Sequence, residues 1–222
     1  ALEALGSHGI NRAAANDPGV EHCRIEPAEE PLRLGGDGSN NLVGGNYSVV
    51  NASSSNSFSF GLTDSVVAST AASVLGGQLN KIDDGHYSAI VGGRNNLVQG
   101  GENSFATGRN NVVTMDNAAA FGLSNQMRGT GSAVFGYQNY VRGYYAIVAG
   151  RENYLANLAD YAAIFGRADT ANGKHVFIAG SYHVVDGDNS AAFGGNRNSI
   201  TGANSATVGG QDIKITGNTN IV

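Results

Sequence analysis

The sequence has 222 residues, a formal net charge of −5 and a charged fraction of 14%, while 41% of its residues are hydrophobic. The acidic balance excludes DNA or RNA as the main partner, because a chain that neutralises phosphates needs a basic surface. Low charge combined with ample hydrophobicity excludes an intrinsically disordered chain. The chain contains 33 glycines but only 3 prolines, which indicates frequent and regular turns.

The first segment, residues 1–34, lacks the repeat that follows. It holds all three prolines, 6 of the 18 acidic residues and the single cysteine, Cys23, so no intrachain disulfide can form. We predict a connector or a cap on the first rung of a repeat structure, because solenoids need their open ends covered. Residues 35–60, which include a Ser/Asn-rich stretch at 46–57, are predicted to form irregular first rungs.

The remaining segment, residues 61–222, repeats the pattern Gly-x-x-Asn-x-apolar at intervals of 14 to 16 residues. A Ser-Ala-x-apolar-Gly block precedes typical copies, and Asp64, Asp169 and His183 replace Asn in three of them. Glycine, asparagine and these substitutes tolerate positive φ, so we expect them to form tight turns. The copies begin at Gly61, Gly77, Gly93, Gly108, Gly122, Gly136, Gly150, Gly166, Gly180, Gly195 and Gly210.

Each repeat therefore contains two short strands and two turns, which is one circuit of a narrow β-roll. We predict an all-β chain folded as a parallel β-roll solenoid of about 11–12 rungs, with neighbouring strands about 4.8 Å apart. A three-sided β-helix is the second choice, because it normally needs more residues per circuit.

Both sides of the Ser-Ala-x-apolar strand are apolar, as Ala120 and Val134 on one side and Phe121 and Phe135 on the other illustrate. A thin roll has one interior, so the second apolar side is predicted to meet other copies of the chain. We expect a homo-oligomer, with three-fold symmetry favoured. The alternative is a single wide roll that encloses both apolar sides.

Equivalent positions of successive rungs stack into ladders, and several of these ladders are aromatic or basic. We predict a binding surface for a protein or glycan there, because aromatic and arginine clusters suit such contacts. The alternative is that stacked tyrosines shield neighbouring strands. The candidate binding residues are Tyr137, Tyr140, Tyr154, Arg94, Arg109, Arg151 and Arg167.

Other polar clusters do not predict chemistry. Asp83 and Asp84, like Asp186 and Asp188, lie in turn sequences where aspartate is common. The repeat offers no insertion long enough to build a cleft for two catalytic carboxylates. We therefore predict no catalytic residues, no metal site and no cofactor.

The repeat Asn-Ser-x-Ala-x-Gly-x-x-Asn, seen at residues 189–195 and 204–210, resembles the YadA-like head of trimeric autotransporter adhesins. The likeness covers about residues 57–217, and similar repeats occur in bacteriophage tail fibres. It implies a homotrimer of left-handed parallel β-rolls displayed on a stalk at the bacterial surface, with roles in cell adhesion and virulence. The rung lengths of 14 to 16 depart from the 14 residues of regular heads in that family.

These observations predict a non-enzymatic, surface-exposed head module that attaches to a host-cell protein, a host glycan or the matrix. A bacteriophage tail fibre or virion appendage is the alternative, followed by a glycan-depolymerising tailspike and a purely structural filament. We expect an extracellular location on the bacterial cell surface, or on a virion for the alternative. No apolar run is long enough for a membrane helix, so direct membrane insertion is not expected within this sequence. We expect the sequence to be a piece of a longer protein, with any anchor outside it.

Overall fold

The computed structural model describes residues 10–11, 24–25, 40–51 and 53–222, and these residues form strands and turns without a helix. No helix of the described ranges could cross a membrane. Within the predicted connector at residues 1–34, β1 (Ile10–Asn11) pairs antiparallel with β2 (Arg24–Ile25). The remainder of that segment, including Cys23, lies outside the described residues.

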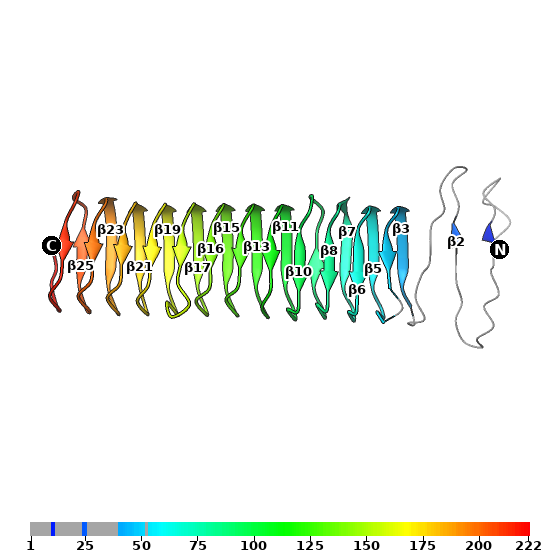
Figure 1. Cartoon of the computed structure of the whole chain (residues 1–222), viewed down its shortest axis with the longest axis horizontal. Coiled ribbons are helices and arrows are strands. Elements are labelled where there is room, and N and C mark those ends of the chain that lie inside the picture. Colours follow the sequence, from blue (N-terminus) through cyan, green and yellow to red (C-terminus); the bar gives the residue numbers. More distant parts are fainter. Residues whose placement is uncertain (1–9, 12–23, 26–39, 52) are drawn as a thin grey trace.

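The rest of the described chain winds through two parallel sheets of 12 strands each, which alternate along the sequence (Figure 1). We call the first the wide sheet, because its strands reach six residues. Its strands are β3 (Leu42–Asn46), β5 (Phe58–Leu62), β7 (Ser73–Gln78), β9 (Ala89–Ile90), β11 (Phe105–Arg109), β13 (Ala119–Leu123), β15 (Ala133–Tyr137), β17 (Ile147–Arg151), β19 (Ala163–Arg167), β21 (Phe177–Ser181), β23 (Ala191–Asn196) and β25 (Ala206–Val208).

The second sheet is the narrow sheet, whose strands have two or three residues. Its strands are β4 (Val49–Val50), β6 (Ser65–Val67), β8 (Lys81–Asp83), β10 (Leu97–Gln99), β12 (Val112–Val113), β14 (Gln126–Met127), β16 (Tyr140–Val141), β18 (Tyr154–Leu155), β20 (Thr170–Ala171), β22 (Val184–Val185), β24 (Ser199–Ile200) and β26 (Lys214–Ile215). One wide and one narrow strand make a rung, so the chain is a parallel β-solenoid of 12 turns. The predicted all-β roll is confirmed, and its two sheets exclude the three-sided β-helix.

Successive rungs stay in register along the rod. From β11 to β19 all five residues of each wide strand pair with their equivalents in the next, for example Gly122 with Gly136 and then Gly150. The register shifts between β5 and β7 and between β21 and β23, where the following strand carries a second glycine, Gly76 or Gly194. At about 4.8 Å per rung, the 12 rungs form a rod of roughly 50 Å.

The core is a single line of apolar side chains between the two sheets. Each rung contributes one inward side chain from the wide sheet and one from the narrow sheet, such as Val134 and Val141, and both are fully buried. Small and large residues compensate within a rung, as Ala120 opposite Met127 shows. Because the interior is this thin, the outer side of the wide sheet is not enclosed, and the alternative of one roll enclosing both apolar sides is wrong.

A glycine ends the regular part of each wide strand because the neighbouring rung leaves no room for a side chain. Gly136 has φ of +119°, and a Cβ there would fall on the carbonyl oxygen of Gly150. Gly108, Gly122 and Gly150 show the same conflict with the next rung. The repeated glycine is therefore required by close backbone stacking between rungs as well as by the turn.

The repeated asparagine does not supply the positive φ of the turn, which corrects the prediction. Positive φ falls on the residue before it, such as Ser124 or Gln138, and not on the asparagine itself. The buried Asn125 instead donates from Nδ2 to the Gly136 carbonyl at 2.9 Å, while its Oδ1 accepts from Asn139 N and Nδ2 at 3.0 Å. The asparagines thus form a continuous hydrogen-bonded ladder inside the turn, from Asn80 through Asn96, Asn111, Asn125 and Asn139 to Asn153.

Candidate functional site

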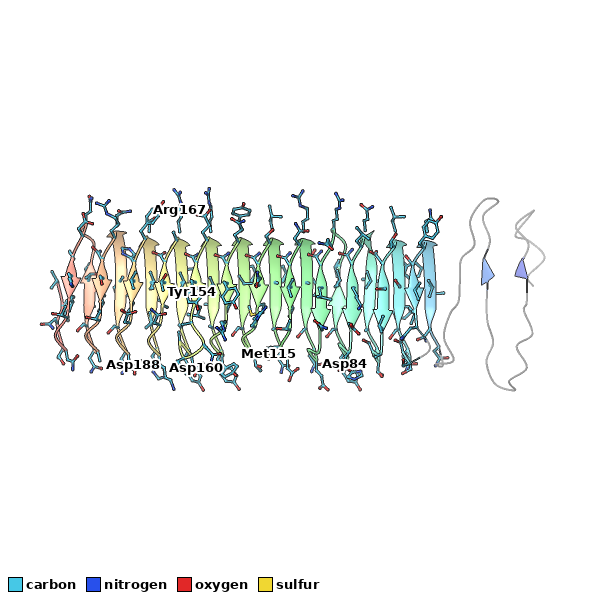
Figure 2. The ribbon with its side chains drawn as sticks, in the orientation of Figure 1. Asp84, Met115, Tyr154, Asp160, Arg167 and Asp188 are labelled. Carbon is cyan, nitrogen blue, oxygen red and sulfur yellow. The ribbon has the colours of Figure 1, made fainter. Side chains whose placement is uncertain are left out.

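The described rod presents two outer faces and two edges, and the predicted binding residues lie on one edge and one face. Five of them occupy the last position of a wide strand or its equivalent: Arg94, Arg109, Tyr137, Arg151 and Arg167. Register aligns Tyr137 with Arg151 and Arg151 with Arg167. Figure 2 shows Arg167 projecting from this edge, which we call the arginine edge.

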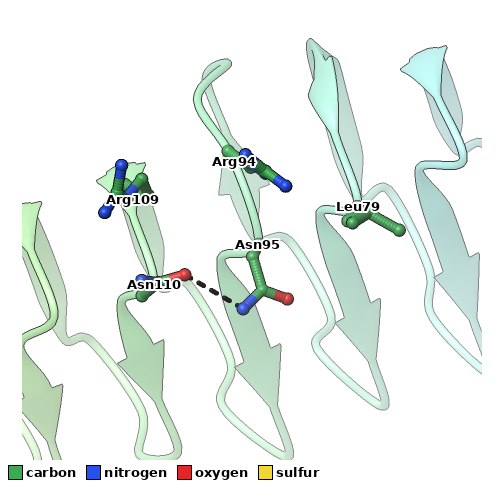
Figure 3. A pocket seen from close by; sticks show the side chains of 5 residues that line it. All are labelled: Leu79, Arg94, Asn95, Arg109 and Asn110. Carbon is green, nitrogen blue, oxygen red and sulfur yellow. Dashed lines mark hydrogen bonds between the residues drawn. The ribbon is translucent and has the colours of Figure 1, made fainter.

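A shallow hollow of about 390 Å³ lies at the arginine edge (Figure 3). It is lined by Leu79, Arg94, Asn95, Arg109 and Asn110. Asn95 Nδ2 donates to Asn110 Oδ1 at 3.0 Å, so part of its polar lining is already paired. The hollow could take a small polar or anionic group but does not enclose one.

The arginines further along this edge are partly engaged by neighbours. The Arg151 guanidinium lies 5.7 Å from the Tyr137 ring centre and 3.1 Å from Glu152 Oε1, and Arg167 lies 5.3 Å from the ring centre of Tyr182. Exposed pairs of this kind add little stability.

The two remaining predicted residues, Tyr140 and Tyr154, lie on the outer face of the narrow sheet. Their rings stack at 5.5 Å with an interplanar angle of 1°, and the Arg128 guanidinium lies 5.7 Å from the Tyr140 ring centre. The structure therefore places the seven residues in two neighbouring columns and does not gather them into one pocket. Their role in binding a partner stays a prediction.

The opposite edge carries acidic side chains. Figure 2 shows Asp84, Asp160 and Asp188 projecting there, away from Arg167. A stack of Tyr145, Tyr161 and His175 runs along successive turns of this edge, with neighbouring ring centres 5.3 Å apart. Among the described residues, no three acidic, histidine or cysteine side chains come together as a metal site would need.

Three titratable groups interrupt the asparagine ladder inside the rod. Asp169 takes an asparagine position and is fully buried; its Oδ1 accepts from His183 N at 2.8 Å, whereas its Oδ2 has no hydrogen-bond partner. Burial raises the pKa of Asp169 to about 6 and raises the pKa of Asp64 in the same way. Burial lowers the pKa of His183, whose Nδ1 accepts from Asn198 N at 3.1 Å and so carries no proton. These groups face the interior and are not placed to react with a ligand.

One continuous surface was not predicted as a binding site: the outer side of the wide sheet, which we call the wide-sheet face. Its two outward columns are the first and third residues of each wide strand, for example Ala133 and Phe135. Exposed apolar side chains follow one another along it, including Leu75, Val91, Phe135, Ile147, Phe165, Phe193 and Val208. We predicted this second apolar side from the sequence but expected it to contact other copies of the chain.

This geometry defines a class of protein: the chain is a slender parallel β-solenoid with periodic outer faces and no deep cleft among its described residues. The model of the family described as grass antifreeze β-roll matches residues 98–194. This range runs from the middle of β10 to the middle of β23, which is the most regular part of the rod. No curated protein matches the chain.

The match overturns the resemblance to YadA-like adhesin heads and the function drawn from it. A trimeric adhesin, a phage fibre and attachment to a host surface are therefore wrong predictions for this chain. The physical reason is that close-stacked glycines, a buried amide ladder and inward apolar residues are needed by any narrow parallel roll. Those residues identify the roll and carry little information about what its outer faces bind.

Proposed function

We propose that this chain binds ice and slows the growth of ice crystals, as an antifreeze β-roll. The match to the grass antifreeze β-roll over residues 98–194 is the observation that carries this proposal. The fold supports it in physical terms. Ice presents a periodic, rigid surface, and a rod whose backbone repeats once per rung can meet such a surface with many equivalent contacts at once.

Rigidity is the second requirement. Many weak contacts give net affinity only when few side chains and loops lose conformational freedom on binding. The rod is ordered in advance by the parallel ladders of both sheets and by the buried asparagine ladder. The outward side chains of the wide sheet are mostly short or aromatic, and such side chains lose little rotamer entropy on contact.

The purified chain is expected to separate the melting and freezing temperatures of a small ice crystal and to suppress recrystallisation in a frozen film. It should also concentrate in a slowly grown ice front. A globular protein of similar mass at the same molar concentration serves as the control for solute effects. Freezing behaviour identical to that control would remove the proposal.

Association of copies is a separate prediction that the single chain leaves open. The apolar wide-sheet face motivates it, because monomers rarely expose large contiguous apolar patches. Light scattering of the purified chain measures it directly: a mass near three times 22.7 kDa is expected for the homotrimer, and 22.7 kDa would exclude it. The left-handed winding, the absence of enzymatic activity and an extracellular location also stay predictions.

A further inference from the structure

We propose that the wide-sheet face is the plane that contacts ice; this inference rests on the proposed function and deepens it. The choice lies between two outer faces of one rod, which share the same rung spacing. They differ in charge, in the evenness of their side chains and in the length of the strands that support them.

The wide-sheet face carries no charged residue in either outward column. Over all 12 rungs the hydroxyls of Ser73 and Thr107 are its only polar side-chain groups, and Thr107 Oγ1 already donates to the Val91 carbonyl at 2.7 Å. The first column is Leu42, Phe58, Ser73, Ala89, Phe105, Ala119, Ala133, Ile147, Ala163, Phe177, Ala191 and Ala206; the third-position column is Gly44, Phe60, Leu75, Val91, Thr107, Phe121, Phe135, Ala149, Phe165, Ala179, Phe193 and Val208.

The two columns also complement one another in size. From β11 to β23 each rung has one bulky and one small outward side chain, for example Ala133 with Phe135 and Phe177 with Ala179. Neighbouring rings pack face to face along the rod: Phe121 and Phe135 have ring centres 4.8 Å apart at 9°. One bulky group per rung gives an even surface, and the outward residues of these rungs lie within the range that matches the antifreeze family.

The energetics of contact with ice favour such a face over a polar one. A polar group that leaves liquid water for ice exchanges one set of hydrogen bonds to water for another, so its net gain is small. A charged group holds a hydration shell of its own and is costly to strip. Apolar groups restrict the orientation of their first water layer and compete little for its hydrogen bonds. That layer can therefore join the crystal at low cost.

The narrow sheet is poorly suited by the same criteria. Its outward positions include charged side chains on five rungs: Lys81 and Asp83 share one, and Arg128, Arg142, Asp186 and Lys214 lie on the other four. Arg128 packs over Tyr140, which makes this face uneven. Its strands are two or three residues long, so less flat backbone lies behind them.

A pair of lysine substitutions on one rung tests the choice of face. Ala179 is an outward residue of β21, in register between Phe165 and Phe193, and Val184 is an outward residue of β22 in the same rung. Ala179→Lys is expected to weaken adsorption to ice about tenfold. The lysine ammonium must either lose its hydration shell or keep a layer of liquid water between the face and the crystal. Val184→Lys should match the wild-type chain. Ala149→Lys on β17 repeats the test between Phe135 and Phe165.

Each variant is compared with the wild-type chain for ice uptake, thermal melting and mass by light scattering. The wide-sheet face is supported if Ala179→Lys and Ala149→Lys both lose adsorption while their thermal melting is unchanged and Val184→Lys still adsorbs to ice. Loss in Val184→Lys alone, equal loss in all three, or loss in none overturns it while the proposed function stands. An oligomer that Ala179→Lys converts to a monomer with undiminished ice uptake also overturns it, because a second copy would then cover this face. A wild-type chain without ice uptake removes the proposed function and this inference together.

Discussion

Gly136→Ala is expected to destabilise the rod by more than about 3 kcal/mol, because a buried backbone clash adds to an unfavourable backbone conformation. At φ of +119° an L-residue is strained, and its Cβ would fall on the Gly150 carbonyl oxygen. The two rungs would have to separate, which also breaks the ladder bond from Asn139 Nδ2 to the Gly150 carbonyl. Chemical denaturation followed by circular dichroism measures the change.

Gly194→Ala is the matched control for that variant. Gly194 also has positive φ, +67°, but nothing lies within 4 Å of a Cβ placed there. Only the cost of the left-handed conformation remains, about 1–2 kcal/mol. Equal losses in the two variants would contradict the claim that close stacking of rungs, and not the turn alone, requires the repeated glycine.

Asp169→Asn is expected to stabilise the chain at pH 7 by about 2 kcal/mol, after allowance for partial screening of the buried charge. An asparagine there restores the amide donor that the ladder lacks at Asp169 Oδ2. It also removes a carboxyl whose pKa burial raises from 3.8 to about 6. Asp84→Asn removes the same charge from an exposed turn and should change stability little.

The pH dependence of the Asp169 contribution follows from the sign of its pKa shift. The folded chain holds the Asp169 proton more tightly than the unfolded chain, so this contribution is fully present below about pH 4 and is lost as pH rises through about 6. The lowered pKa of His183 acts in the opposite direction, because unfolding favours its protonation as pH falls. Denaturation of wild-type and Asp169→Asn chains between pH 4 and 8 should show a stability difference that grows with pH. A constant difference would mean that Asp169 stays ionised in the fold.

The roll and its rungs could be predicted from the sequence because a narrow parallel solenoid imposes two features on each rung: a glycine at a fixed place and alternation along the strand. Gly136 and its equivalents mark where rungs touch, and alternation such as Ala120 with Phe121 marks which side chains turn inward. Periodicity alone could not show that Asn125 bonds along the rod, because asparagine is equally common in turns. The positive φ of Ser124 could not be predicted, because serine is not a residue type that indicates this conformation.

The function could not be predicted from the same residues. The pattern that resembled an adhesin head lies in the ladder and the core, such as Asn198 and Ala192, which no ligand can reach. The informative positions are outward, where Phe165 and Ala179 suit contact with a copy of the chain and contact with ice alike. The absence of charge and the one-bulky-group pattern of that face become visible only when strand register is known.

Ice adsorption seen on a single crystal tests the proposed function most directly. A dye on Cys23, the only cysteine in the sequence, reports where the chain accumulates as the crystal grows. We predict fluorescence that persists on defined ice planes after the free chain is washed away, and that is about tenfold weaker for the Ala179→Lys chain. A crystal that excludes the labelled wild-type chain as it excludes a labelled control protein would contradict the proposal.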